Sequence, residues 1–92
     1  MTLAQPKFAL GQTVITRQAK AVLNPHDVTN AVWRHSAGDW GDCGSEDWKE
    51  NELSLQQGAR LFSVYRDRNG RDFWVITEAD RSSTTVLLPE DY

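Results

Sequence analysis

Arg60-Leu-Phe-Ser-Val-Tyr65 opens the stretch of sequence that decides the fold. It is followed by a turn at Asn69-Gly70, by Phe73-Trp-Val-Ile-Thr77 and finally by Thr84-Thr-Val-Leu-Leu88. All three runs are rich in β-branched and aromatic residues and are separated by turn-forming residues, which is typical of strands. Asn-Gly between two such runs is among the strongest short hairpin signals. The sequence therefore predicts a three-stranded antiparallel meander.

The Asn69-Gly70 turn also predicts how the first two strands pair. A two-residue loop of type I′ would place Val64 opposite Val75 and Tyr65 opposite Trp74. The same register sets two carboxylates, those of Asp67 and Asp72, opposite each other, which is mildly unfavourable. A longer loop with a bulge would remove that clash and stays open as an alternative.

The amino-terminal part predicts one strand and a short helix. Phe8–Leu10 and Thr13–Thr16 favour an opening strand, or two short ones bent at Gly11. Thr16 is a suitable N-cap for a short helix from Gln18 to Leu23, which is rich in alanine and straight-chain residues.

Two further helices precede the meander. Asn24 can cap a helix that has proline at its first position and runs to about His35. After a glycine-rich loop, Ser45 is expected to cap another helix that Gly58 ends. The predicted fold is α+β: an N-terminal strand, two or three helices, then a three-stranded antiparallel meander packed against the helices, in a single domain covering residues 1–92.

Composition limits the class of protein. With 92 residues, 39% hydrophobic and 25% charged, the chain has the size and balance of one globular domain. It contains no apolar run long enough to span a bilayer, Met1-Thr-Leu-Ala-Gln lacks the basic segment of a signal peptide, and Cys43 is the single cysteine. We expect a cytoplasmic protein that does not enter membranes.

Charge argues against direct binding of nucleic acid. The formal net charge is −3, and basic residues gather only at the predicted hairpin tip, at Arg66, Arg68 and Arg71. Proteins that coat nucleic acid neutralise phosphates with clustered Lys and Arg side chains, and this chain has few of them. A small basic patch at the hairpin tip remains an alternative.

The acidic residues are more concentrated and suggest a protein-binding surface. Within twelve positions the chain carries Asp39, Asp42, Glu46, Asp47 and Glu50. Trp40 lies in the glycine-rich loop among them and is the best candidate for an exposed aromatic anchor, whereas the other large aromatic residues, Trp33 included, are expected mainly in the core. An acidic surface of this kind can occupy a basic nucleic-acid channel on a protein partner. This is the preferred functional hypothesis.

A small ribonuclease-type toxin is the alternative. Its catalytic residues would be His35, Glu78 and Arg81, joined by Arg60 and Tyr65 on one sheet face. Histidine is the usual general base, and Asp39 or Asp42 could orient it. The simpler interpretation is that His35 packs at a helix end and that the Glu78–Arg81 turn satisfies its own backbone. The acidic net charge also disfavours this hypothesis.

Cofactor and metal motifs are not evident. Cys43 with His26 and His35 lacks the paired spacing of a structural zinc site. Asp39, Asp42 and Asp47 could hold magnesium, but such sites have no diagnostic spacing. We expect no cofactor, and a monomer or a homodimer; in a third reading the chain is a dimerising module, although Pro89 would blunt the last strand if that strand lay at an edge.

Several phrases of the chain resemble a family of small uncharacterised bacterial proteins carried on plasmids and integrated mobile elements. The phrases are Leu10-Gly-Gln12, Arg34-His35 with Gly38-Asp-Trp-Gly41, Arg60–Tyr65, Ile76-Thr-Glu-Ala-Asp-Arg-Ser82 and Thr85-Val-Leu-Leu-Pro-Glu-Asp-Tyr92. They are distributed from residue 10 to residue 92 of the chain. The family has no established activity, so the resemblance implies a setting, the bacterial cytoplasm and mobile DNA, and no catalytic residues.

Overall fold

The computed structural model describes residues 5–92 and has the predicted α+β class. The first residues used in the signal-peptide argument, 1–4, lie outside the described part. In chain order the elements are β1 (Gln12–Ile15), α1 (Arg17–Val22), α2 (Pro25–Ser36), α3 (Ser45–Gln57), β2 (Leu61–Arg66), β3 (Asp72–Thr77), β4 (Ser83–Leu87) and a short 3-10 helix η1 (Pro89–Asp91).

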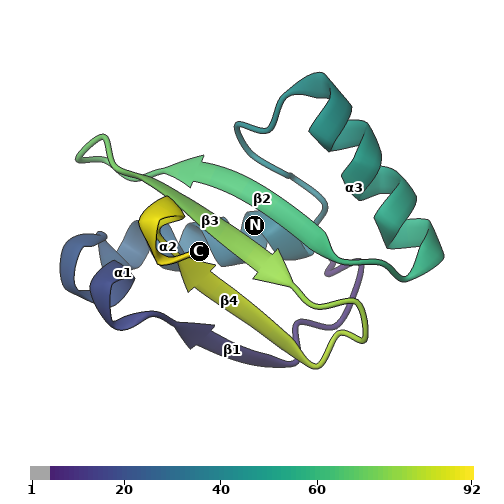
Figure 1. Cartoon of the computed structure of the whole chain (residues 1–92), viewed down its shortest axis with the longest axis horizontal. Coiled ribbons are helices and arrows are strands. Elements are labelled where there is room, and N and C mark those ends of the chain that lie inside the picture. The colour runs from purple at the N-terminus through teal and green to yellow at the C-terminus, as the bar shows by residue number, and fades with distance from the viewer. Residues whose placement is uncertain (1–4) are drawn as a thin grey trace.

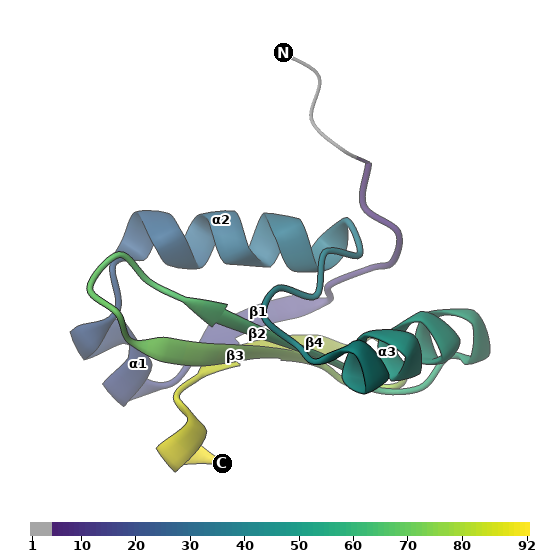
Figure 2. The same cartoon turned by 90° about the horizontal axis from the view of Figure 1, so that it is seen from above.

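The four strands form one sheet in the order β1-β4-β3-β2. Strands β2, β3 and β4 make the predicted antiparallel meander, and β1 joins it in parallel alongside β4. Figure 2 shows α2 lying across one face of the sheet and η1 on the opposite side. In Figure 1, α3 lies beyond β2, at the other edge of the sheet from β1.

The β2–β3 hairpin differs from the type I′ prediction by one residue. Tyr65 lies opposite Phe73, not Trp74, and Ser63 lies opposite Val75. The reason is a longer loop: Gly70 N–H donates to the Asp67 carbonyl, Asp67 N–H donates to the Arg71 carbonyl, and Gly70 has a φ of 80°. This is the three-residue loop with a glycine bulge, the alternative that separates Asp67 from Asp72.

The helix starts follow the predicted caps with one exception. The Thr16 hydroxyl accepts from Ala19 N–H at the start of α1, and the Asn24 side chain accepts from His26 and Asp27 N–H at the start of α2. The exception is α3, where the cap is Gly44 and Ser45 is already the first helical residue. The glycine cap supplies no side-chain bond, so the first turn depends on its acidic residues, which favour a helix N-terminus.

The meander is covered on both faces, but unequally. The α2 side buries the larger core, in which Tyr65, Phe73, Val75 and Val86 pack with residues of α1 and α2. On the other face the Trp74 ring is flanked by two aromatic rings, with centroids 4.9 Å away for Phe62 and 5.6 Å away for Tyr92. The short η1 and the residue after it lie on that face (Figure 2).

The last strand does not lie at an edge of the sheet. We expected Pro89 to blunt an edge formed by the last strand, but β4 lies inside the sheet, between β1 and β3. The edges are β1 and β2. Among residues 5–92, no helix is long and apolar enough to cross a membrane.

Candidate functional site

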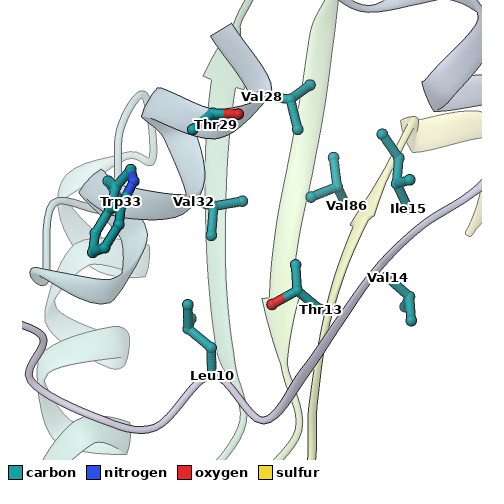
Figure 3. A pocket seen from close by; sticks show the side chains of 9 residues that line it. All are labelled: Leu10, Thr13, Val14, Ile15, Val28, Thr29, Val32, Trp33 and Val86. Atoms are coloured by element: carbon teal, nitrogen blue, oxygen red, sulfur yellow. The ribbon is translucent and has the colours of Figure 1, made fainter. Parts of the chain in front are cut away.

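An apolar groove runs between α2 and β1 on the helix-covered side of the sheet (Figure 3). Its volume is about 330 Å³. Its lining carries no formal charge: Leu10, Thr13, Val14, Ile15, Val28, Thr29, Val32, Trp33 and Val86. Binding clefts are typically concave and mostly apolar, and this groove has both properties.

Large apolar side chains on the walls of the groove are exposed to solvent. Trp33 of α2 is 52% exposed, and Val14 and Ile15 of β1 are 40% and 37% exposed. Figure 3 shows Trp33 on the helix wall and the two β1 side chains on the opposite side. Trp33 was expected in the core, and that expectation is wrong because the helix turns it outward from Ala31 and His35, which are buried. Exposed apolar groups gathered at one place mark an interaction surface.

A second apolar cavity continues the groove toward α1. It has a volume of about 240 Å³ and shares three lining residues with the groove: Ile15, Val28 and Thr29. Its far end is lined by Leu23 and Lys20. The apolar surface therefore follows β1 along its length and ends beside a cation.

The backbone of β1 is hydrogen-bonded on one side only. Gln12 N–H donates to the Ser82 carbonyl and Thr16 N–H donates to the Val86 carbonyl, each with an N···O distance of 3.0 Å. Because alternate residues of a strand bond to opposite sides, the N–H and C=O groups of Thr13 and Ile15 point away from β4. Within the described chain no other strand pairs with β1. These groups lie at the rim of the groove.

The outer edge of β2 is closed. Phe62 N–H donates to Asn51 Oδ1 over 2.9 Å, and Asn51 Nδ2 donates to the Phe62 carbonyl over 2.6 Å. Val64 N–H donates to the Trp40 carbonyl over 3.2 Å, and Asp42 N–H donates to the Val64 carbonyl over 2.7 Å. Asn51, in the middle of α3, and the loop before that helix thus occupy the positions that another strand would take.

Charge is divided between the two edges. The first 36 residues, which form β1, α1 and α2, carry four basic residues and one carboxylate, Asp27. That carboxylate is ion-paired with Arg68 at 3.0 Å. Among residues 5–92, no ion pair involves Lys7, Arg17 or Lys20. The groove side of the molecule is therefore basic, although the protein as a whole is acidic.

His35, the proposed general base, is fully buried in a chain of hydrogen bonds. Its Nδ1 lies 2.5 Å from Ser63 Oγ and its Nε2 lies 2.8 Å from Thr77 Oγ1. Thr77 Oγ1 lies 2.7 Å from Thr84 Oγ1, which donates to the Leu10 carbonyl over 2.7 Å. Since a carbonyl only accepts, each proton in the chain has a fixed place: Thr77 donates to Thr84, His35 Nε2–H donates to Thr77, and Ser63 donates to Nδ1.

The buried environment keeps His35 neutral. Loss of solvation, with a smaller contribution from the positive charge of Arg81, lowers the pKa of His35 to about 4. The rings of Phe8 and Trp40 pack edge-on against it, with centroid distances of 5.3 Å and 5.6 Å. No substrate reaches this imidazole in the folded protein, so its role is to connect the strands beneath α2.

The other proposed ribonuclease residues do not join His35 in a cleft. Arg81 donates to the carbonyls of Ser54 and Ala59, over 3.3 Å and 2.6 Å, and so satisfies the end of α3. Glu78 lies on the surface, 3.8 Å from the Arg60 guanidinium. Tyr65 is buried and its hydroxyl donates to the Asp39 carbonyl over 2.6 Å. Burial raises the pKa of this phenol.

The predicted acidic surface is present only in part. Asp42, Glu46, Asp47 and Glu50 are exposed on the loop and on the first half of α3. Asp39 is half-buried and ion-paired with Arg34 at 2.8 Å, and this hydrogen-bonded guanidinium lowers the pKa of the carboxyl group.

Trp40 is not an exposed anchor, contrary to expectation. Its exposed fraction is 0%, and its ring stacks against that of Phe8. Its indole Nε1–H donates to Glu52 over 3.2 Å. The carboxylate of the preceding residue, Asp39, accepts from Gly41 N–H at a distance of 3.1 Å. The turn that this bond stabilises directs the indole of Trp40 inward.

The candidate metal ligands do not gather. Within the described residues there is no group of three or more His, Cys, Asp or Glu side chains arranged to hold a metal ion. Burial raises the pKa of the Cys43 thiol, and its Sγ donates to the Phe62 carbonyl over 3.5 Å.

The groove was not found from the sequence, although part of a signal was there. Val28, Val32 and His35 mark the inward face of α2 at helical spacing, and Trp33 falls outside that stripe. A large aromatic residue outside the buried stripe of a helix is a candidate contact residue. The open edge of β1 could not be inferred, because the parallel pairing with β4 depends on tertiary structure.

Searches against protein-family models, curated proteins and solved structures returned no match to this chain.

Proposed function

We propose that this chain is a small, non-enzymatic protein-interaction module and that its main contact surface is the groove between α2 and β1. The observation that carries the proposal is the exposure of Trp33, Val14 and Ile15 around an uncharged groove in a domain of only 92 residues. A small domain gains stability from burying such side chains, and aromatic residues dominate the binding energy of interfaces.

The acidic residues of α3 are a second contact region within the same proposal. Asp42, Glu46, Asp47 and Glu50 lie on the loop and helix that close the β2 edge, away from the groove. An exposed acidic surface attracts a basic partner and increases the association rate. Two regions of opposite charge would let one small module join two proteins, or fix one partner's orientation.

The proposed setting is the bacterial cytoplasm, on behalf of a plasmid or another mobile element. It rests on the resemblance of phrases such as Arg60–Tyr65 and on the single cysteine. In that setting, a suitable partner is a host complex that handles nucleic acid or acts in defence.

The test is affinity capture of the tagged protein from bacterial lysate, with and without nuclease. Trp33→Ala removes the exposed indole, and Leu53→Ala is the matched control, because Leu53 is 47% exposed on α3 and does not line the groove. We expect a stoichiometric protein that survives nuclease, is lost with Trp33→Ala and is kept with Leu53→Ala.

Two outcomes would overturn the proposal. Equal recovery of the protein partner with both variants would remove the groove from the interface. Recovery of RNA alone, sensitive to nuclease and to substitution of Arg66 and Arg71 at the hairpin tip, would favour an RNA-directed function instead.

A further inference from the structure

We infer that the groove accepts an extended, acidic peptide segment of a partner protein, which adds to β1 as a fifth strand of the sheet. This inference rests on the proposed function, because it names the kind of partner that the groove binds. The backbone of β1, the shape of the surface beside it and the charges around it all favour such a peptide.

The backbone supplies the first step. Thr13 and Ile15 each direct one N–H and one C=O group away from β4, since the backbone hydrogen bonds of Gln12 and Thr16 are made toward it. Both residues are exposed, so a peptide can reach these groups without displacing a side chain. Pairing of an extended peptide with an open sheet edge is a common mode of recognition in which main-chain hydrogen bonds provide affinity.

The groove supplies the second step. In a strand, successive side chains point to opposite faces, so alternate side chains of an added strand would lie on the α2 side of the sheet. There they meet the wall formed by Val28, Val32 and Trp33, and the neighbouring cavity extends that wall to Leu23 (Figure 3). The expected peptide therefore has apolar residues at every second position.

The charges around the groove favour acidic residues at the other positions of the peptide. Lys20 lines the end of the second cavity, Arg17 follows β1 by two residues, and the Lys7 N–H donates to the last residue of α2, Ser36, over 2.7 Å. No ion pair within residues 5–92 involves these cations. The elements lining the groove offer a single carboxylate, Asp27, which Arg68 occupies. A peptide with Asp or Glu beside its apolar residues complements this surface.

The same charges argue against a second copy of the chain. Pairing two β1 strands would bring Lys7, Arg17 and Lys20 of one copy beside those of the other. Neither β1 nor α1 carries a carboxylate, and the one beside them, that of Asp91, already accepts from the Thr16 hydroxyl over a distance of 2.7 Å. Like charges facing each other across an interface disfavour association. An acidic peptide meets no such repulsion.

The experiment is selection from a phage-displayed library of random ten-residue peptides, followed by affinity measurement of the selected peptides by fluorescence polarisation. We expect enriched peptides to alternate apolar residues and to carry two or more carboxylates. Enrichment of basic or helical amphipathic peptides, or no enrichment, would overturn the inference.

Thr13→Pro and Thr13→Val separate strand addition from other binding modes. Proline removes the outward N–H without touching the bonds to β4 and is tolerated at a sheet edge, whereas valine keeps the N–H and the side-chain shape. We expect Thr13→Pro to bind the peptide roughly tenfold more weakly than Thr13→Val, which keeps every backbone group. Circular dichroism and thermal unfolding confirm that both variants are folded.

The outcomes also separate this inference from the proposed function. If Trp33→Ala abolishes binding while the two Thr13 variants bind equally, the groove binds peptides but not by strand addition, and only the inference fails. If Trp33→Ala binds as well as the original chain, the proposed function fails too.

Charge is tested in the same assay. Arg17→Gln with Lys20→Gln should weaken binding of the selected peptides several-fold, and the matched control Lys49→Gln on α3 should not. Equal affinities in all three proteins would contradict the acidic character of the peptide.

Discussion

Strand β2 meets the protein's own chain along its outer side, whereas strand β1 meets solvent. The β2 edge is covered by Asn51 of α3 and by the loop at Trp40 and Asp42, which bond the backbone of Phe62 and Val64. At the β1 edge, the outward groups of Thr13 and Ile15 have no strand beside them within the described chain. An unpaired edge invites association, and most proteins protect it.

The difference assigns different roles to the two edges. Closing β2 takes a buried asparagine in the middle of a helix, where its propensity is poor, so this edge is built for stability. The β1 edge is short and is followed by Arg17 and Lys20, features that limit unspecific pairing. Beside it lies an apolar groove. We infer that β1 is left open for a partner.

Removing the side chain that closes β2 should have the largest effect on stability. Asn51→Ala leaves the Phe62 N–H without a partner and its carbonyl with only the Cys43 thiol, a weak donor, and each lost bond to a buried group costs about 1–3 kcal/mol. We expect the free energy of unfolding to fall by about 3–4 kcal/mol in urea titrations. Glu50→Ala, at the exposed neighbouring position, is the control and should change it by less than about 0.5 kcal/mol.

Acid should loosen both edges together, because the His35 chain runs from Ser63 in β2 to the Leu10 carbonyl just before β1. The pKa of His35 is about 4 when folded and about 6.5 when unfolded, so between these values the unfolded chain binds a proton that the folded chain does not. The free energy of unfolding should therefore fall as the pH drops from 6.5 to 4, by about 3 kcal/mol.

Urea titrations between pH 7 and 4.5 measure this dependence. His35→Gln should have a lower free energy of unfolding at pH 7, but that free energy should not fall with pH in the way expected for the original chain. The carboxyl groups with lowered pKa, such as those of Asp27 and Asp67, lose their contribution only below their unfolded pKa near 3.8, so they do not mask the effect. A slope that persists in the variant would refute the assignment to His35.

A change at the start of β1 should have a smaller effect, confined to that edge. Gly11 has a φ of 65°, and a Cβ there would lie 2.3 Å from the Ser82 carbonyl oxygen. We expect Gly11→Ala to cost about 2 kcal/mol, through the left-handed conformation and a shift of β1 away from β4. Peptide binding at the groove should be lost, while the Asn51–Phe62 bonds at the β2 edge persist in NMR spectra.

The exposed indole should matter least for stability. Trp33 is 52% exposed, so Trp33→Ala should change the free energy of unfolding by less than about 1 kcal/mol while abolishing partner binding. Thermal unfolding and affinity capture measure the two effects. A loss of several kcal/mol would mean that Trp33 is part of the core and that the groove is a packing feature.

The sequence predicted the features that depend on neighbouring residues. The meander, the helix caps at Thr16 and Asn24 and the stop at Gly58 depend on neighbouring residues, and all were predicted. The one-residue hairpin error came from Asp67, whose carboxylate accepts from the N–H groups of Asn69 and Arg71 and favours the longer loop. A side chain that bonds its own turn can override a dipeptide signal.

The features that depend on distant residues were missed. Trp40 is inside because Phe8 and His35 enclose it, and Gly41 follows it because a Cβ there would lie 2.0 Å from the Val64 carbonyl oxygen. Neither contact has a local sequence pattern. The open β1 edge and its groove arise only when β1 pairs with β4, about seventy residues later in the chain.

The most direct test of the contrast between the edges is amide hydrogen exchange of the free protein, measured by NMR. The account predicts fast exchange at Thr13 and Ile15 and strong protection at Phe62 and Val64, whose N–H groups bond Asn51 and Trp40. Protection of Thr13 and Ile15 as strong as that of Val64 would contradict it, because the β1 edge would then already be occupied.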